Sequence, residues 1–439
     1  MKATSFAVLL FTAVALGYQR YDNYKVLQVS PQSETQLRSL LALEYETAYK
    51  VDFWRRPSRV GGRAVVMIDP EHYVTLTHRL HTQGMWPTLV QKNVQTWIEQ
   101  QATEIALSQT RRFRTGDDPK DFVFDQYHTH QEINDWLDML ATTYPDLTTV
   151  STVGKSKEGR VMKIIKIGWK GSDKKGFWID AGIHAREWVA PATAVYIINQ
   201  LITKSNDTFK DLLTAVDFFV YPSANPDGYE YTWKHDRLWR KTRGGPYCQK
   251  TRHGTNRCCY GADFNRNWDF KWGYSGTIDD PCSNVYLGPK AFSEIECKQM
   301  ADYVTGLKDK LQAMITLHSY DEDIVYPYGY EVHTYPPDVK DLITLGDQMA
   351  AAIEKVHGTK YRVLNSADGL FPVSGTSDDW AKHLGIKWVY DVQLRPGPGD
   401  TDDDEKYGFE LPAKYILRTA DEVWAGILVL ADRVKTGPN

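Results

Sequence analysis

The chain is short of long hydrophobic runs and of excess charge of either sign. Its 52 Lys and Arg residues nearly balance its 56 Asp and Glu residues, which gives a formal net charge of −4 over 439 residues. A charge balance of this kind gives no reason to expect a nucleic-acid partner. After residue 17, no apolar stretch approaches the length that a membrane-spanning helix needs. The sequence also lacks internal repeats and long low-complexity tracts, so we expect a globular protein of more than one domain.

One apolar run does occur, at the start of the sequence. Met1 and Lys2 are followed by an apolar segment at 6–16, which ends in small residues. This pattern is typical of a secretory signal peptide and is too short for a stable membrane-spanning helix. We therefore expect residues 1–17 to be a signal peptide and the remainder to be secreted, extracellular and free of any membrane.

Cysteine is also scarce, with five residues in the chain. In a secreted protein an odd number predicts disulfides and one remaining thiol. Cys248 and Cys258 flank a basic loop and could close it, while Cys297 lies in a helical pattern and is the best candidate for the free thiol. A different pairing among these three cysteines is almost equally well supported.

A polar segment divides the chain near residues 108–120. It is basic at first and then rich in Gly, Asp and Pro, which is typical of an exposed linker that proteases cut. Short patterns precede it: strands at 24–29, 51–54 and 64–68, and helices starting at Ser33 and after Pro87. We predict a small α+β domain at 18–110, a linker at 111–120 and a larger domain at 121–439.

The larger domain alternates apolar runs with helical patterns. Strands are expected at 162–167, 177–183, 216–221, 313–317 and 386–394, and helices at 190–204, 293–308, 338–357 and 412–433. This alternation predicts an α/β domain with a mixed sheet between helix layers. Ligands of such sheets bind beyond the strand ends, and His184 and His318 each follow an expected strand.

His184 and Glu187 lie three residues apart after the strand at 177–183. Imidazole and carboxylate groups are good zinc ligands, and a catalytic zinc typically has three protein ligands and one open position. A His-x-x-Glu pattern alone is weak evidence, because many solvated surfaces contain one by chance. The metal hypothesis therefore depends on the motifs that accompany it.

Those motifs occur in a fixed order along the larger domain. They are His-Ala-Arg-Glu-Trp at 184–188, Asn-Pro-Asp-Gly-Tyr at 225–229, Arg-Leu-Trp-Arg-Lys-Thr-Arg at 237–243, Asp-Phe-Asn-Arg-Asn-Trp at 263–268, Leu-His-Ser-Tyr at 317–320, Ser-Asp-Asp-Trp at 377–380 and Tyr-Gly-Phe at 407–409. The chain thus resembles the pancreatic A/B type of zinc metallocarboxypeptidase along nearly its whole length after about residue 120. The amino-terminal α+β unit is similar to the inhibitory prosegment of this family, which covers the active-site mouth until cleavage at Arg removes it.

The resemblance implies roles for the matched residues. His184, Glu187 and His318 are the implied ligands of one zinc ion, and Asp263 is the implied carboxylate that orients a ligand histidine. The implied contacts with substrate come from Arg186, Arg237, Asn265, Arg266, Ser319 and Tyr320. Among these, Asn265 and Arg266 resemble the pair that grips a terminal carboxylate, which a guanidinium can bind at two points.

Arg240 and two cysteines complete the implied set. Arg240 resembles the group beside the scissile carbonyl, where negative charge develops. Cys259 and Cys282 stand where the family has its disulfide. Independently of the resemblance, Asn206 begins the one glycosylation sequon.

The resemblance also implies a specificity. Asp378 stands at the floor of the side-chain pocket, where aspartate goes with C-terminal Lys or Arg, as in the B type, because a buried cation needs a paired anion. Asp391 lies two residues before Gln393 on one strand face, so it should point into the same cleft. Thr376 replaces a small glycine of the family and could narrow the pocket.

Two departures concern catalysis. Gln393 stands where the family has the glutamate that takes a proton from the attacking water, and an amide has no basicity. General acid–base groups contribute typically about 10²–10⁴-fold, so at least that loss is expected. Phe371 replaces a tyrosine whose hydroxyl contacts substrate, which removes one hydrogen bond worth about 1–3 kcal/mol at most.

Two hypotheses fit these residues. In the first, the protein is a secreted, monomeric zinc-binding homologue that binds peptide or protein C termini, with C-terminal Lys or Arg preferred, and turns them over poorly. In the second, it is an active B-type metallocarboxypeptidase that releases C-terminal Lys or Arg in extracellular digestion, with Asp391 acting through a water in place of the lost base. Gln393 and Phe371 favour the first.

Overall fold

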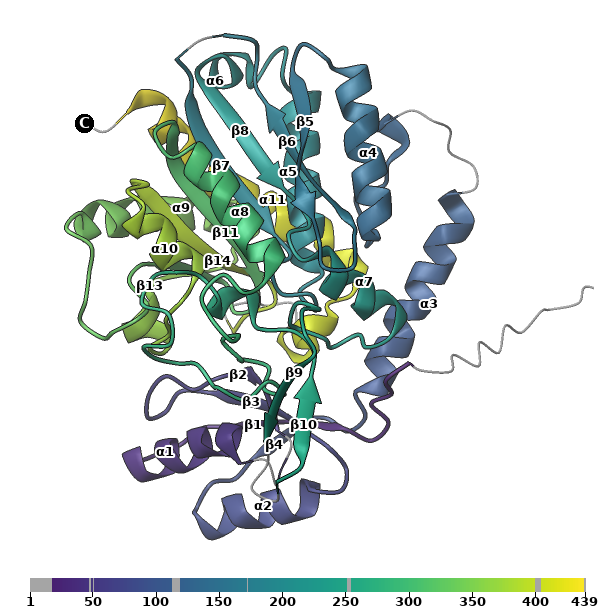
Figure 1. Ribbon diagram of the computed structural model, residues 1–439, viewed down its shortest axis with the longest axis vertical. Helices are drawn as coiled ribbons and strands as arrows, with labels where there is room; N and C mark the ends of the chain where they lie inside the picture. The colour runs from purple at the N-terminus through teal and green to yellow at the C-terminus, as the bar shows by residue number, and fades with distance from the viewer. Residues whose placement is uncertain are drawn as a thin grey trace, which may run out of the picture.

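The computed structural model describes residues 18–46, 49, 51–112, 119–171, 173–250, 254–398 and 404–437. The expected signal peptide and most of the expected linker lie outside this set. The described residues form an amino-terminal domain, 18–112, and a carboxy-terminal domain, 119–437, which lie one below the other in Figure 1.

The amino-terminal domain is an antiparallel sheet with two helices on one face. Its elements are β1 (Lys25–Val29), α1 (Glu34–Ala42), β2 (Asp52–Arg55), β3 (Ala64–Ile68), α2 (Tyr73–Thr82), β4 (Thr88–Gln91) and the long helix α3 (Gln95–Arg112), with strand order β2-β3-β1-β4. Because side chains alternate along a strand, Leu27 and Val66 pack under α1 and α2, whereas Val26 and Val65 face the other domain.

The sequence patterns predict neither α2 nor β4. The first turns of α2 are rich in β-branched residues, which have low helix propensity, and His72 makes no side-chain capping bond. β4 follows Pro87, where a helix is expected, and α3 begins only at Gln95. Since α3 continues to Arg112, it also takes the first two residues of the expected linker.

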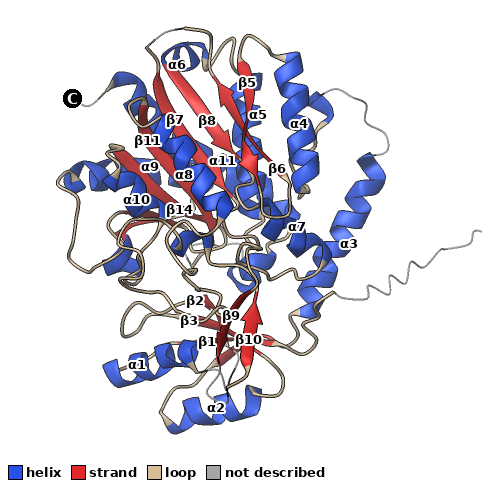
Figure 2. Cartoon of the chain, in the orientation of Figure 1, coloured by secondary structure: helices blue, strands red, loops and turns tan. Residues whose placement is uncertain are grey.

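The carboxy-terminal domain is built on an eight-stranded mixed sheet, shown in red in Figure 2. The strands are β5 (Thr148–Lys155), β6 (Val161–Ile167), β7 (Lys175–Ala181), β8 (Val216–Tyr221), β11 (Leu311–Ser319), β12 (Asp323–Tyr326), β13 (Arg362–Asn365) and β14 (Trp388–Leu394), in the order β13-β12-β14-β11-β7-β8-β6-β5. The central strands β14, β11, β7 and β8 are parallel, and antiparallel pairs join them to the outer strands.

Helices cover both faces of this sheet. They are α4 (His130–Thr143), α5 (Val189–Thr203), α6 (Lys210–Ala215), α7 (Pro226–Lys234), α8 (Ile295–Gly306), α9 (Val339–His357), α10 (Ser377–His383) and α11 (Ile416–Thr436). Ile179 and Ile315 point into the layer of α4, α5, α9 and α11, whereas the adjacent Trp178 and Met314 point toward α8 and α10. The predicted mixed sheet between helix layers is therefore confirmed.

A hydrophobic cluster spans the boundary between the two domains. The open face of the amino-terminal sheet places Trp54 against Phe409, with ring centroids 5.5 Å apart, and Tyr320 packs on the other side of Phe409. Gly408 allows this approach, because it has φ of 52° and a Cβ there would lie 2.8 Å from the Trp54 ring. The amino-terminal domain thus lies directly on segments that border the cleft.

Four cysteines are paired in the structure. Cys248 and Cys258 face each other across the hairpin of β9 (Tyr247–Lys250) and β10 (Asn256–Cys259), and Cys259 is bonded to Cys282. Cys297 is buried and free, as predicted. Among the described helices, none combines the length and apolar character needed to cross a bilayer.

Candidate metal centre and cleft

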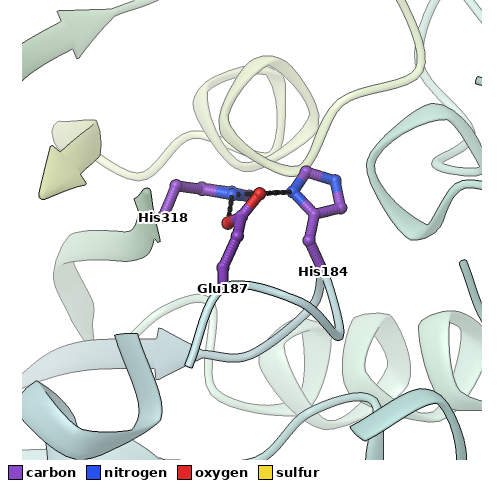
Figure 3. A group of neighbouring side chains, drawn as sticks. All are labelled: His184, Glu187 and His318. Carbon is purple, nitrogen blue, oxygen red and sulfur yellow. Dashed lines mark hydrogen bonds and ion pairs between the residues drawn. The ribbon is translucent and has the colours of Figure 1, made fainter. Parts of the chain in front are cut away.

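The three expected zinc ligands converge at the ends of two adjacent strands. His184 and Glu187 lie in the turn after β7, and His318 is near the end of β11. Glu187 Oε1 is 2.8 Å from His184 Nδ1, Glu187 Oε2 is 3.0 Å from His318 Nδ1, and the two Nδ1 atoms are 3.0 Å apart (Figure 3). All three side chains are buried. Two imidazoles that turn the same nitrogen toward one carboxylate form a donor set that fits zinc.

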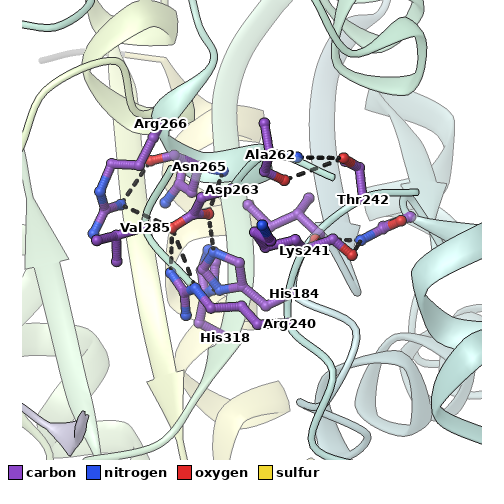
Figure 4. Close-up of polar contacts among 12 residues, drawn as sticks. His184, Arg240, Lys241, Thr242, Ala262, Asp263, Asn265, Arg266, Val285 and His318 are labelled. Carbon is purple, nitrogen blue, oxygen red and sulfur yellow. Dashed lines mark hydrogen bonds and ion pairs between the residues drawn. The ribbon is translucent and has the colours of Figure 1, made fainter. Parts of the chain in front are cut away.

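Asp263 holds the other side of His184. Its Oδ1 is 3.1 Å from His184 Nε2, and its Oδ2 accepts hydrogen bonds from Arg240 Nη2 and Nε at 2.9 and 3.2 Å (Figure 4). Burial alone would raise the pKa of Asp263, but Arg240, Arg266 and His184 hold it well below its usual range. An ionised carboxylate at this nitrogen leaves Nδ1 of His184 available as the metal ligand.

A cavity of about 510 Å³ opens beside these ligands, and residues 43–46 and 51–56 of the amino-terminal domain line one part of it. The sequence-predicted residues that line it are His184, Arg186, Glu187, Arg240, Asn265, Arg266, His318, Ser319, Tyr320, Phe371, Thr376, Asp378, Asp391 and Gln393. These residues come from loops, strands and a helix and are spread over the sequence from His184 to Gln393, and the fold brings them to one place.

Arg266 and Asn265 are held in position by the backbone around them. Arg266 donates to the carbonyl oxygens of Asn265, at 2.7 Å, and Gly276, at 3.2 Å. Asn265 Oδ1 accepts from the backbone N–H of Ser377 at 2.8 Å. Figure 4 shows the guanidinium groups of Arg266 and Arg240 both directed toward the Asp263 carboxylate, where both are nearest to Oδ2. The arrangement places two guanidinium groups, each able to bind a carboxylate at two points, beside the metal ligands.

Gln393 and Asp391 lie side by side on β14. Gln393 is directly opposite His318 in the parallel register with β11, which places it at the metal centre. Its amide nitrogen donates to both carboxylate oxygens of Asp391, at 2.9 and 3.1 Å. Burial raises the pKa of Asp391 to about 7; His318 opposes that rise and Asp378 adds to it. The strand alternation that predicts a shared face for the two residues is confirmed.

Asp378 and Asp379 are adjacent but have different surroundings. Asp379 accepts backbone hydrogen bonds from Gly329 and Tyr330 at 2.7 and 3.1 Å, so it anchors a loop. Asp378 faces the cavity from the first turn of α10, and burial raises its pKa. Thr376 is buried in the cavity wall just before this helix.

The amino-terminal domain reaches the cleft with charged side chains that the sequence patterns do not reveal. Asp52 of β2 pairs with Arg186 at 2.6 Å, and Arg55 pairs with Asp321 at 3.2 Å. Arg56 lies over the ring of Phe371, 4.9 Å from its centroid. The cavity is therefore bounded on one side by residues that are distant in sequence from the metal ligands.

Arg237 differs from its expected role. It is not among the cavity-lining residues, and its guanidinium donates to Gln101 Oε1 and to the carbonyl oxygens of Arg186 and Phe409, at 2.6 to 3.0 Å. Gln101 belongs to α3, so Arg237 joins the two domains in this state. Asn206, the sequon residue, is exposed in the turn between α5 and α6.

Comparison with known proteins agrees with this geometry. The family described as "Zinc carboxypeptidase" matches residues 133–426, and the family described as "Carboxypeptidase activation peptide" matches residues 27–101. The chain belongs to the zinc carboxypeptidase family. Zinc is therefore the metal that the ligand set implies, and the amino-terminal domain corresponds to the activation peptide.

Three similar proteins illustrate the relationship. Carboxypeptidase B of Astacus astacus is 44% identical over 310 residues, which cover 70% of this chain and 97% of that protein. Carboxypeptidase A2 of Rattus norvegicus is 37% identical over 435 residues, covering 98% of this chain and 99% of that one. The crystal structure of thrombin activatable fibrinolysis inhibitor superimposes with a TM-score of 0.82 at 29% identity, covering 95% of this chain and 100% of that chain.

Proposed function

We propose that this protein is a secreted zinc carboxypeptidase homologue that binds peptide or protein C termini ending in Lys or Arg and hydrolyses them slowly or not at all. The observation that carries the proposal is Gln393, an amide beside the metal ligands at the position where the family resemblance implies a glutamate base. The domain limits proposed from the sequence are a signal peptide at 1–17, an inhibitory prosegment at 18–110, a linker at 111–120 and the zinc domain at 121–439.

His184, Glu187 and His318 would hold the zinc ion. Bound zinc would supply a Lewis acid that polarises a carbonyl and lowers the pKa of water. The protein groups around the metal site would bind the substrate and stabilise developing charge. Arg266 and Asn265 bind the terminal carboxylate of the peptide, and Arg240 lies where it can stabilise negative charge on the scissile carbonyl oxygen.

Proton transfer is the step that the cleft supports least. A base must accept a proton from the attacking water and return one to the leaving amine. The Gln393 amide can do neither, and its N–H bonds are directed to Asp391. Binding loses one hydroxyl contact at Phe371, worth about 1–3 kcal/mol at most, whereas hydrolysis loses its base, so affinity without efficient turnover is the expected result.

The side-chain specificity follows from the cavity wall. Asp378 is a buried carboxylate that faces the cavity and has no ion pair among the described residues. A buried anion is stabilised by a cation that enters with it. We therefore expect the protein to prefer peptides that end in Lys or Arg. The side chain of Thr376 determines the width of the pocket.

The test uses the full chain after trypsin treatment, loaded with zinc, and a blocked dipeptide that ends in arginine. Binding is measured by calorimetry and turnover by release of free arginine. We expect a measurable affinity, with kcat about 10²-fold or more below that of the double variant Asp391→Asn/Gln393→Glu, which restores a carboxylate at 393. Phe371→Tyr is the matched control, because it adds a hydroxyl to the same cleft but no proton acceptor.

The opposite outcome identifies the second hypothesis. If the wild-type protein releases arginine at ordinary enzyme rates and the double variant is no faster, the reaction needs no base at 393. The buried carboxylate of Asp391, 2.9 Å from the Gln393 amide nitrogen, is then the group to test as the replacement.

A further inference from the structure

Asp391 lies in the same cavity as Asp378 but comes from a different element. Asp391 is on the central strand β14, between β11 and β12, so its direction is fixed by two sets of backbone hydrogen bonds. Asp378 is in the first turn of α10. Both line the cavity and both are buried, with 8% and 3% of their surfaces exposed. Two rigid elements therefore present two carboxylates to one pocket.

Neither carboxylate forms an ion pair within 4 Å among the described residues, and the His318 imidazole that acts on both from farther away is an expected metal ligand. The described ion pairs of the cavity-lining residues use other carboxylates, and none uses Asp378 or Asp391. Those carboxylates are Glu44, Asp52, Glu187, Asp263, Asp280, Asp321 and Glu405. Buried carboxylates are normally paired with a cation or held by several hydrogen bonds. Asp379 satisfies this rule through two backbone N–H groups, whereas Asp391 has only the Gln393 amide. Asp378 and Asp391 both line the cavity, so a cationic ligand bound there can pair with them.

The Gln393 amide determines which part of Asp391 remains available. A carboxylate only accepts hydrogen bonds, so the group that faces it must be the amide nitrogen. That nitrogen contacts both oxygens from one side, at 2.9 and 3.1 Å. A carboxylate has about four acceptor sites, so Asp391 keeps others for a ligand. A glutamate at 393 would instead put a second anion against Asp391.

We propose that Asp391 is a second specificity residue of the side-chain pocket, which together with Asp378 receives one guanidinium and favours C-terminal arginine over lysine. The inference rests on the proposed function of the cleft as a site for C-terminal Lys or Arg. A guanidinium is planar and has five N–H donors on several edges, so it can bond to carboxylates on two sides at once. An ammonium group is compact and strongly hydrated, and it gains less from the second carboxylate.

The experiment compares four blocked dipeptides that differ only in the C-terminal residue: arginine, citrulline, lysine and leucine. Citrulline has nearly the shape of arginine without its charge. Affinities are measured by calorimetry on the trypsin-treated, zinc-loaded full chain. Where a peptide is hydrolysed during the measurement, the ratio of kcat/KM values replaces the ratio of affinities, because it reports the same discrimination.

We expect wild-type protein to bind the arginine peptide about tenfold or more tightly than the citrulline and lysine peptides, the usual effect of one charge-assisted contact. Asp391→Asn should weaken arginine binding about tenfold and bring the arginine-to-lysine ratio near one. Asp378→Asn should weaken both cationic peptides. Asp280→Asn is the control, since it also removes a carboxylate from the cavity wall, but one that is already paired with Arg257 at 2.8 Å.

Folding is checked by zinc content and thermal unfolding of each variant, and Asp391→Thr serves as a second variant if Asp391→Asn is unstable. An unchanged arginine-to-lysine ratio in either folded variant overturns the role of Asp391 while leaving the proposed function intact. Tighter binding of leucine than of arginine by the wild-type protein overturns the proposed function itself. Slow or fast hydrolysis does not affect the comparison.

Discussion

At the scale of single residues, Gln393 and Asp391 act as one unit. The amide donates to the carboxylate, so the negative charge of this strand face sits at 391 instead of 393. Two carboxylates at this distance repel each other, and one of them takes up a proton. Restoring a base at 393 therefore depends on the residue at 391.

This dependence makes a prediction about the exchange of the two groups. Gln393→Glu alone should raise kcat only modestly, because the introduced carboxylate would share a proton with Asp391. Asp391→Asn/Gln393→Glu exchanges the amide and the carboxylate at constant charge, and should raise kcat by about 10²-fold or more. Steady-state assays of arginine release test both variants. Equal rates for the single and the double variant would show that Asp391 does not oppose a base at 393.

The metal ligands give a second prediction at this scale. His318→Ala removes one of three buried ligands, so zinc should be lost at a concentration of chelator that leaves the wild-type protein loaded. Elemental analysis of the purified protein measures the zinc content.

His130→Ala is the matched control for that variant. His130 is equally buried, but its ring nitrogens contact Ser223 Oγ and the carbonyl oxygen of Val161, far from the centre. It should keep a full complement of zinc. Retention of zinc by His318→Ala, or its loss in His130→Ala, would contradict the assigned ligand set.

At the scale of elements, strand β2 brings two charged side chains of the amino-terminal domain to the cleft. Asp52 and Arg55 point from it to Arg186 and Asp321, and the side chains of both pairs are at most 13% exposed. Breaking a buried ion pair by removing one partner costs about 3–5 kcal/mol. These two contacts should therefore dominate the electrostatic part of domain docking.

The corresponding prediction concerns the chain after cleavage of the linker. Asp52→Ala should weaken the association of the two fragments about 10²-fold or more, because Arg186 would stay buried without its partner. Size-exclusion chromatography of the trypsin-cleaved protein at micromolar concentration measures the dissociated fraction. Arg20→Ala is the control, because the Arg20 side chain is 56% exposed and such pairs contribute at most about 1 kcal/mol. Co-elution of the Asp52→Ala fragments would contradict the assignment.

The elements also show how far the sequence predicts this protein. The central strands and the longest helices follow from apolar runs and periodicity, and strand alternation suffices to put Asp391 and Gln393 on one face. Helix α2 cannot be predicted from hydrophobic periodicity, because only Leu76 and Leu80 are buried along it and its β-branched residues have low helix propensity.

Sequence patterns also cannot predict the contacts that the amino-terminal domain makes with the site, for a different reason. Asp52 and Arg186 are 134 positions apart, and nothing local to either residue indicates the partner. Arg237 is a related case: its motif indicates a substrate contact, but its neighbours Gln101 and Phe409 become visible only when the domains are placed together. Periodicity predicts which face of an element is buried, but not which charged groups meet across a domain boundary.

At the scale of the whole molecule, the chain consists of two folded domains joined by a short connection. The amino-terminal domain is fixed to the carboxy-terminal domain by the cluster around Trp54 and Phe409 and by α3, whose Gln101 bonds to Arg237. A protease that cuts between the domains would leave both cores intact. Release of the first domain would then remove the part of the cavity wall that it supplies and widen access to the metal ligands.

This organisation leads to the last prediction, that trypsin cleaves the intact protein first within residues 111–120. Arg111, Arg112 and Arg114 supply three closely spaced sites there, beyond Ile105 of α3, which packs against the other domain's cluster of Tyr127 and Trp188. The basic hairpin loop between Lys250 and Asn256 is the main competitor, but the Cys248–Cys258 disulfide would hold a cut there together. Gels run with and without reductant therefore distinguish the two sites, since cleavage at 111–120 separates fragments without reduction and cleavage in the hairpin does not.

Binding of the arginine dipeptide should appear only after that cleavage and after release of the amino-terminal domain. Full binding by the uncleaved chain would mean that the amino-terminal domain does not close the cleft in solution.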